Sequence, residues 1–178
     1  MKNGASNTLK TKRERKMSER EIIPFVSWAE RNILVDGDKP VHFQEHQRKI
    51  LSRAFQLGSD GRLPYSTILY SCPKKSGKTS IGGFVSLWFG YELEPGTEII
   101  LAANDLEQST GRVFKEIKKM IERSPVLKSR VGAMTAKEIT LIDGTCIKAI
   151  ASDAAGEAGS NPSLTVFDEL WGYTSERS

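Results

Sequence analysis

The sequence predicts a three-layer α/β fold with a mainly parallel sheet. Apolar, β-prone runs alternate with stretches of helical spacing along most of the chain, which is the pattern of strands joined by crossover helices. Two of the runs also lead into polar motifs: the run at 66–70 precedes a Gly-Lys-Thr loop, and the run at 164–167 ends in two adjacent carboxylates. We expect the second run to deliver those carboxylates to the C-terminal edge of the sheet.

Residues 72–79, Cys-Pro-Lys-Lys-Ser-Gly-Lys-Thr, match the phosphate-loop consensus G-x-x-x-x-G-K-[ST], except that Cys72 stands at the first glycine position. Gly77 lets the backbone turn its N–H groups toward phosphate oxygens, and the next helix directs its positive end at the same anion. Lys78 is expected to reach the β- and γ-phosphates during catalysis, and the Thr79 hydroxyl to ligate Mg²⁺. The predicted nucleotide-binding residues are Gln47, Lys74, Lys75, Ser76, Gly77, Lys78, Thr79 and Ser80.

A Gly-Lys-Thr turn that arose by chance is the alternative for this loop. The strand expected before it and the helix expected after it disfavour that interpretation. Together the alternating segments and the loop predict a P-loop NTPase fold.

The second motif, Leu164-Thr-Val-Phe-Asp168-Glu169, has the form of a Walker B strand. Asp168 is expected to hold Mg²⁺, directly or through water, and Glu169 to polarise the attacking water as a catalytic residue. The alternative is that the two acids cap a following helix. The phosphate loop upstream in the same chain favours the metal site.

The composition of the 178 residues, 38% hydrophobic and 27% charged, is typical of a soluble globular protein. No apolar run approaches the roughly 20 residues of a membrane helix, and the basic N-terminus has no apolar signal-peptide core. The two cysteines, Cys72 and Cys146, do not suggest a disulfide framework. We therefore expect an intracellular, reducing compartment.

The net charge of +4 comes from the N-terminus. Residues 1–21 hold seven Lys or Arg against three Glu, whereas the remainder has equal numbers of basic and acidic residues. We expect 1–21 to be a disordered basic tail and 22–178 to form a P-loop ATPase domain, which the family resemblance described below implies is partial. Contact with nucleic acid and simple solubilisation are both open for this tail.

Element by element, the spacing of apolar residues predicts the following order. Helices are expected at 24–34, 42–57 and 81–89, and a further helix after Asn104 or Asp105. Strands are expected at 66–70, 98–103, 139–142, 146–150 and 164–167. A turn is expected at 35–40 and a flexible loop at 151–163. On one side of the second helix should lie Phe43, Gln47, Ile50, Leu51 and Phe55, and the buried stripe of the last helix should be Leu106, Val113, Ile117, Met120 and Ile121. Lys115, Lys118, Lys119 and Arg123 then form a basic face, either solvated or facing DNA.

His42 and His46 match the H-x-x-E-H zinc pattern. They are the only histidines, and no third ligand stands out in the sequence, so we do not expect zinc. We expect this segment to contribute to nucleotide binding through Gln47, because its amide can donate to and accept from an adenine base at once.

The order of these features resembles the ATPase portion of the large subunit of tailed-phage terminases, the motors that package DNA. The segments that carry the resemblance are 25–28, 35–37, 43–51, 72–79, 102–108, 154–161 and 166–169. The resemblance implies an ATP- and Mg²⁺-dependent motor that moves double-stranded DNA. It also implies homo-oligomeric assembly, a small terminase subunit and a portal protein as partners, and the host cytoplasm as the location.

The chain ends nine residues after Glu169, where the family continues with the rest of its ATPase sheet and a nuclease domain. In such ATPases the strand after Walker B lies between the Walker B strand and the P-loop strand. The resemblance thus implies an incomplete sheet with unpaired edges, self-association and weak ATPase activity. It also implies an Asp168 held out of reach of Thr79.

Two other functions are open at this point. A superfamily 2 helicase also pairs a glutamine motif with an Asp-Glu strand end, although Leu170 and Trp171 do not continue its pattern. Alternatively, the chain binds nucleotide or a partner without turnover. ATPase assays with and without DNA separate the last case from the others.

Overall fold

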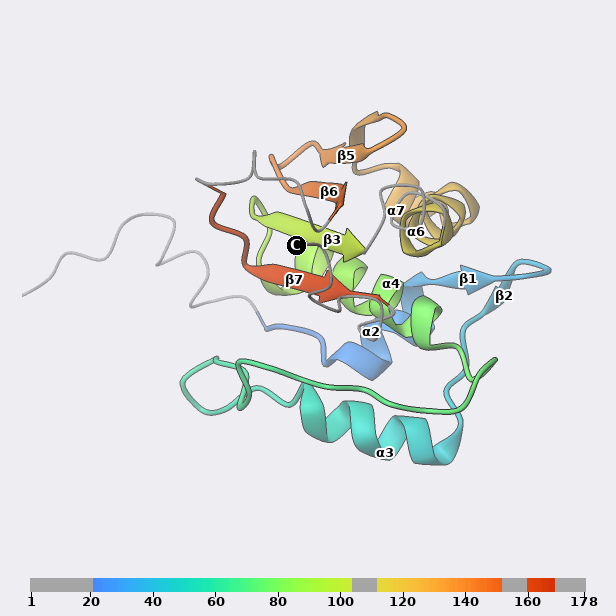
Figure 1. Cartoon of the computed structure of the whole chain (residues 1–178), viewed down its shortest axis with the longest axis vertical. Coiled ribbons are helices and arrows are strands. Elements are labelled where there is room, and N and C mark those ends of the chain that lie inside the picture. Colours follow the sequence, from blue (N-terminus) through green and yellow to red (C-terminus); the bar gives the residue numbers. More distant parts are fainter. Residues whose placement is uncertain (1–20, 104–111, 152–159, 169–178) are drawn as a thin grey trace, which may run out of the picture.

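The computed structural model describes residues 21–103, 112–151 and 160–168 (Figure 1). The expected basic tail, Leu106 with its helix start, most of the 151–163 loop, and Glu169 lie outside the described residues.

A five-stranded sheet forms the centre of the structure, in the order β4-β5-β6-β3-β7 (Figure 1). Its strands are β3 (Glu98–Ala103), β4 (Val131–Met134), β5 (Glu138–Leu141), β6 (Cys146–Ala151) and β7 (Leu164–Phe167). β3 runs parallel to both β6 and β7, whereas the pairs β4–β5 and β5–β6 are antiparallel. The sheet is therefore mixed rather than mainly parallel, because a hairpin and the unexpected strand β4 extend one side of it.

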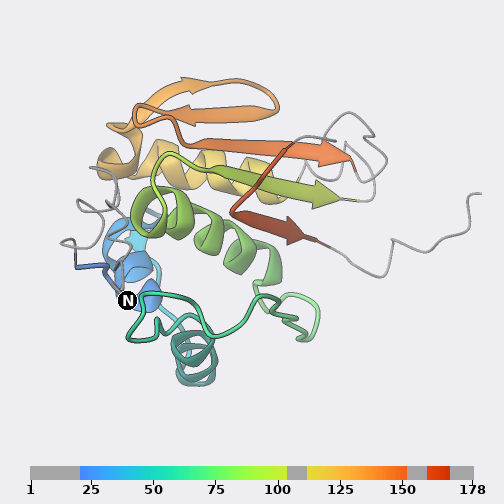
Figure 2. The same cartoon turned by 90° about the vertical axis from the view of Figure 1, so that its left-hand side faces the viewer.

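Helices cover one face of this sheet within the described residues (Figure 2). The side chains that point toward them are buried, as in Ile99 and Leu101 of β3 and Ile147 and Ala149 of β6. On β3 the intervening Ile100 and Ala102 are buried as well, as expected of a strand covered on both faces. On β7 the side chains alternate, which leaves Phe167 on the other face, 55% exposed. The described part is thus α/β with a helical layer on one side, and the expected third layer is not seen in it.

The helical layer contains α2 (Phe25–Asn32), α3 (Glu45–Ala54), α4 (Lys78–Trp88), α6 (Val113–Arg123) and α7 (Pro125–Lys128). α4 continues into a π-helical turn at Phe89–Leu93, and β1 (Leu34–Val35) and β2 (Lys39–Pro40) form a small hairpin at the expected turn. Rings of Phe25, Phe43, Phe55 and Trp88 pack together with centroids 4.8–5.9 Å apart. The predicted stripe of α6 is confirmed from Val113 to Ile121.

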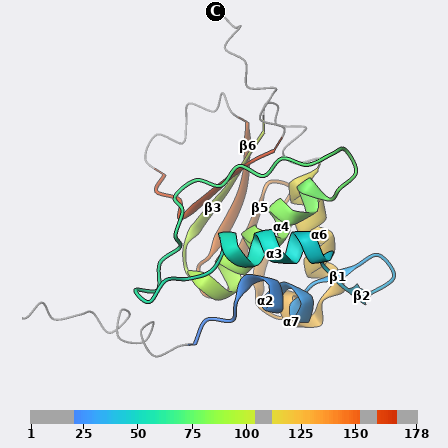
Figure 3. The ribbon, with the colours of Figure 1, turned by 90° about the horizontal axis from the view of Figure 1, so that it is seen from below.

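Two expectations near the phosphate loop are wrong. Residues 66–70 do not form a strand, and Leu69 is 78% exposed (Figure 3). Apolar, β-prone residues form a strand only beside a partner strand, and no described strand pairs with this segment. The second helix begins at Glu45 rather than at His42, because the side chains of Gln44 and Gln47 form a capping box there. On its expected apolar side Leu51 and Phe55 are buried, whereas Ile50 is 50% exposed.

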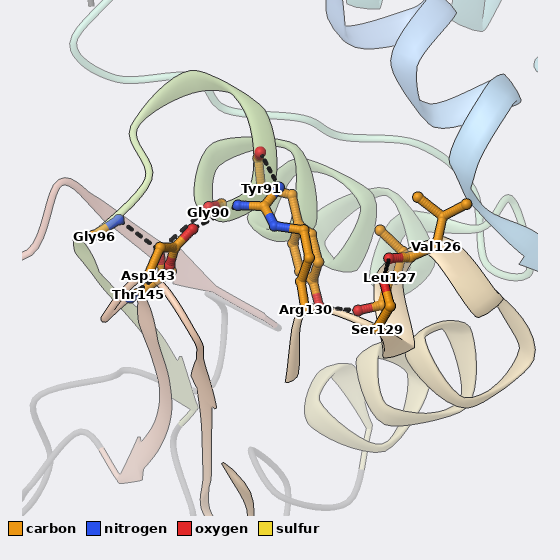
Figure 4. A network of polar contacts seen from close by, with 9 residues as sticks. All are labelled: Gly90, Tyr91, Gly96, Val126, Leu127, Ser129, Arg130, Asp143 and Thr145. Atoms are coloured by element: carbon orange, nitrogen blue, oxygen red, sulfur yellow. Dashed lines mark hydrogen bonds and ion pairs between the residues drawn. The ribbon is translucent and has the colours of Figure 1, made fainter. Parts of the chain in front are cut away.

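A polar network joins the end of α4 to the β5–β6 turn (Figure 4). Arg130 donates to the Tyr91 carbonyl at 2.7 Å, stacks over the Tyr91 ring and pairs with Asp143. Burial alone would raise the pKa of Asp143, but hydrogen bonds from Thr145 and Arg130 outweigh it and lower that pKa. The network therefore stabilises the fold above the ordinary carboxyl pKa, and this contribution is lost as the pH falls through the lowered value.

Thr145, a polar member of this network, is fully buried. Its hydroxyl accepts from the Gly96 N–H at 2.7 Å and donates to the Gly90 carbonyl at 3.3 Å. We expect Thr145→Val, which keeps the shape but loses both bonds, to lower the free energy of unfolding by about 1–3 kcal/mol. Chemical denaturation measures this. The control Thr165→Val, at an exposed β7 position, should change it by less than about 0.5 kcal/mol, and equal values for the two variants would contradict the prediction.

Candidate functional site

The phosphate loop is an exposed, tightly turned segment in front of α4. Gly77 has φ of 78° and Lys75 φ of 66°, a region that suits glycine and is uncommon for lysine. Lys78 folds back so that its Nζ donates to the Cys72 carbonyl at 2.9 Å. The ammonium groups of Lys74, Lys75 and Lys78 belong to exposed residues, so the loop presents positive charge to solvent.

The N-terminus of α4 is open to an anion. Gly77 is its N-cap residue and supplies no side-chain oxygen to the first-turn amides. Those amides carry the positive end of the helix dipole, and a glycine here lets a ligand approach the backbone closely. α4 has eleven residues, which is long enough for this effect, and the lysines of the loop add to it.

Thr79, in the first turn of α4, lies beside Asp168 at the end of β7. The Thr79 Oγ1 and Asp168 Oδ2 atoms are 3.3 Å apart, although the residues are 89 positions apart in the chain. The expectation that Asp168 would be out of reach of Thr79 is therefore wrong. Hard oxygen ligands of this kind are what Mg²⁺ prefers, and two neighbouring ligands of an octahedral Mg²⁺ lie about 2.9 Å apart. The pair fits a magnesium site.

The physical reason for this proximity is the packing of α4 on the sheet. One turn after Thr79, Gly82 faces Val166 of β7, and a Cβ added there would lie 3.3 Å from the Val166 Cγ1 atom. Gly83 makes a similar close approach to Ile117 of α6. Thr79 is thus placed by the contact between helix and sheet, which does not require residues 66–70 to pair as a strand.

Gln47 contacts the phosphate loop directly. Its amide nitrogen donates to the Ser76 carbonyl at 3.4 Å, and its amide oxygen accepts from the Gln44 N–H at 3.0 Å. Tyr70 lies beside it: partial burial and the neighbouring Cys72 raise the pKa of the Tyr70 phenol, and a hydrogen bond with Gln47 opposes that rise. In this structure Gln47 therefore connects α3 to the loop, while its expected adenine contact stays a prediction.

The structure thus brings Gln47, Ser76, Gly77, Lys78 and Thr79 together with Asp168. Ser80 follows in the first turn of α4. Gly82 and Tyr70 are site-supporting residues that motif reasoning did not single out. A small residue one turn into the helix was the available signal for Gly82, but it becomes meaningful only once its neighbour Val166 is known.

Within the ranges described, no three or more His, Cys, Asp or Glu residues gather as a metal cluster. His42 instead lies 3.6 Å from Glu30, which also pairs with Arg48. None of the described helices is both long and apolar enough to cross a membrane.

The fold is similar to that of a solved phage protein, the large terminase of bacteriophage HK97. The structures match with a TM-score of 0.68 and 24% sequence identity, over 82% of this chain and 30% of the terminase chain. The chain thus spans less than a third of that protein's length. No family model matches the sequence, and no curated protein matches it either. The likeness shows a terminase-like fold.

The Gly82 contact can be tested by whether a larger side chain at this position raises or lowers the free energy of unfolding. At a solvated helix position, Gly→Ala raises stability by about 1 kcal/mol. We expect Gly82→Ala to show no such gain, because its Cβ would crowd Val166, and Gly82→Val to lower the free energy of unfolding by about 1–3 kcal/mol. Thermal and urea unfolding measure both values. A full gain in the alanine variant would contradict a tight α4–β7 contact.

Proposed function

We propose that this chain is the ATP-binding part of a terminase-like ATPase motor. The observation that carries the proposal is the 3.3 Å approach of Thr79 and Asp168 at the open N-terminus of α4. A hydroxyl, a carboxylate and a lysine-bearing anion site in one place are the parts that phosphoryl transfer from a nucleoside triphosphate needs. The terminase-like fold supports the same assignment.

Within this proposal the loop residues hold the triphosphate. The first-turn amides of α4 donate to phosphate oxygens, and Lys78 exchanges its present acceptor, the Cys72 carbonyl, for the β- and γ-phosphates. Lys74 and Lys75 supply additional positive charge from the exposed loop. Thr79 and Asp168 would hold Mg²⁺, which when bound neutralises charge that develops on the phosphates.

Glu169 is proposed as the residue that orients the attacking water. Its position directly after Asp168 carries this role, because adjacent residues at the end of a strand point in different directions and can serve different tasks. A carboxylate of this kind accepts a proton from water during attack on the γ-phosphate.

The terminase likeness also supports double-stranded DNA as the moved substrate, with a small terminase subunit and a portal protein as partners and a homo-oligomer as the working form. Basic side chains for a DNA contact lie on α6, although three of them already interact with other groups of the protein. Lys118 donates to the Thr135 carbonyl, Lys119 pairs with Glu116, and Arg123 pairs with Asp36. The tail at 1–21, with its excess of basic residues, is the other candidate for that contact.

Titration calorimetry with Mg-ATP tests the proposal. Lys78→Ala should weaken binding by at least roughly tenfold, because it removes a charge-assisted contact to phosphate. Lys49→Ala, which removes an exposed lysine from α3, is the matched control and should leave the affinity within about twofold. Equal affinities of the Lys78→Ala variant and the unaltered protein would exclude this loop as the nucleotide site. DNA-stimulated hydrolysis by the unaltered protein would support the motor function, and binding without turnover would limit the proposal to nucleotide binding by this part of a motor.

A further inference from the structure

The start of β7 is held by a set of polar contacts centred on Glu98, at the opposite end of the sheet from the candidate site. The Glu98 carboxylate pairs with Lys148 of β6 at 2.7 Å and accepts a hydrogen bond from the Ser160 hydroxyl. The Asn161 N–H also donates to it. The Glu98 backbone carbonyl accepts from the Ser163 N–H at 2.9 Å, so one residue of β3 contacts three residues just before β7, where the Thr97 hydroxyl also contacts that of Ser163.

We propose that Glu98 is a positioning residue that sets the register of β7 and thereby places Asp168 against Thr79. The proposal rests on the proposed function, since it assigns a role toward the magnesium ligands of that site. Glu98 acts through β7 and does not itself touch nucleotide or metal.

The geometry of β7 explains why an anchor is needed. The strand has only four residues, and in the described structure it pairs on one side alone, with β3 from Ile99↔Leu164 to Ala102↔Phe167. A four-residue strand with one partner has few ladder hydrogen bonds to fix its register, and a slip of one residue would turn every side chain to the opposite face. Such a slip would turn Val166 away from Gly82 and Asp168 away from Thr79.

Contacts hold β7 at both ends. At its far end the Asp168 N–H donates to the Ala102 carbonyl at 3.3 Å, which is a long bond. At its near end the bonds to Glu98 involve a charged acceptor, and such bonds are roughly twice as strong as neutral ones. The Glu98 carboxylate therefore contributes directly to holding the start of β7.

The electrostatics of Glu98 agree with this role. Its side chain is 21% exposed, and the hydrogen bonds from Lys148 and Ser160 lower its pKa. A lowered pKa means that the anchor stabilises the fold above the ordinary carboxyl pKa and is lost as the pH falls through the lowered value. The anchor is therefore fully charged at neutral pH.

The test uses Glu98→Gln, Ser160→Ala and a matched control, Glu116→Gln, which also separates a carboxylate from a lysine, at 2.9 Å on α6. ATP affinity is measured by calorimetry in EDTA and in MgCl₂, and the ratio of the two affinities is the magnesium gain. The magnesium gain of each variant is compared with that of the unaltered protein and of Asp168→Asn. We expect Glu98→Gln to reduce the gain by roughly tenfold, the scale of one lost charge-assisted contact. Ser160→Ala should reduce it less, and Glu116→Gln not at all. Affinity in EDTA, which does not depend on bound magnesium, should stay within about twofold in Glu98→Gln, Ser160→Ala and Glu116→Gln.

Amide hydrogen exchange provides a readout that does not need nucleotide. The amides of 164–168 should exchange faster in Glu98→Gln, while those of α4 keep their rates. An unchanged magnesium gain, or an equal loss of affinity in EDTA and in MgCl₂, would overturn the positioning role. An unaltered protein without any magnesium gain would overturn the proposed function and the metal-positioning role with it. Exchange at 164–168 would then still decide whether Glu98 anchors β7.

Discussion

The close packing of α4 against β7 is the contact on which the candidate site depends. Gly82 lets the helix approach Val166, and this approach carries Thr79 to within 3.3 Å of Asp168. A Cβ at position 82 would lie 3.3 Å from the Val166 Cγ1 atom, so Val166 or the helix would have to shift by a few tenths of an ångström. Metal ligands must be held within about half an ångström of their working geometry, so a shift of the helix at this contact would act directly on the distance between Thr79 and Asp168.

Much of the fold could be predicted from local pattern, and the exceptions have one cause. Strands β3, β5, β6 and β7 and helix α6 follow from apolar runs and periodicity, which record burial directly. The segment 66–70 has the same apolar character, but a strand also requires a neighbour, and its own residues cannot reveal whether one is present. β4 was missed for the converse reason: Val131–Met134 contains a glycine and has little alternation, yet it pairs with β5.

In the candidate site, too, some residues could be predicted from local sequence and others could not. Gly77, Lys78, Thr79 and Asp168 could be proposed from the sequence because their spacing suits the chemistry of phosphate and magnesium, and the structure places Thr79 beside Asp168. The expectation that Thr79 and Asp168 would lie apart failed, because it treated strand order as the only determinant of their distance. The supporting contacts, Gly82 to Val166 and Glu98 to Ser160, join residues 62 or more positions apart. No local motif encodes such pairs.

A double-mutant cycle between Thr79 and Asp168 tests most directly whether these residues form one magnesium site. Thr79→Val and Asp168→Asn are compared, singly and together, by the gain in ATP affinity that magnesium provides over EDTA. If one cation binds both oxygens, each single variant should remove most of that gain, and the double variant should lose no more than either alone. Losses that multiply in the double variant would show two independent residues, and would contradict the account of the site.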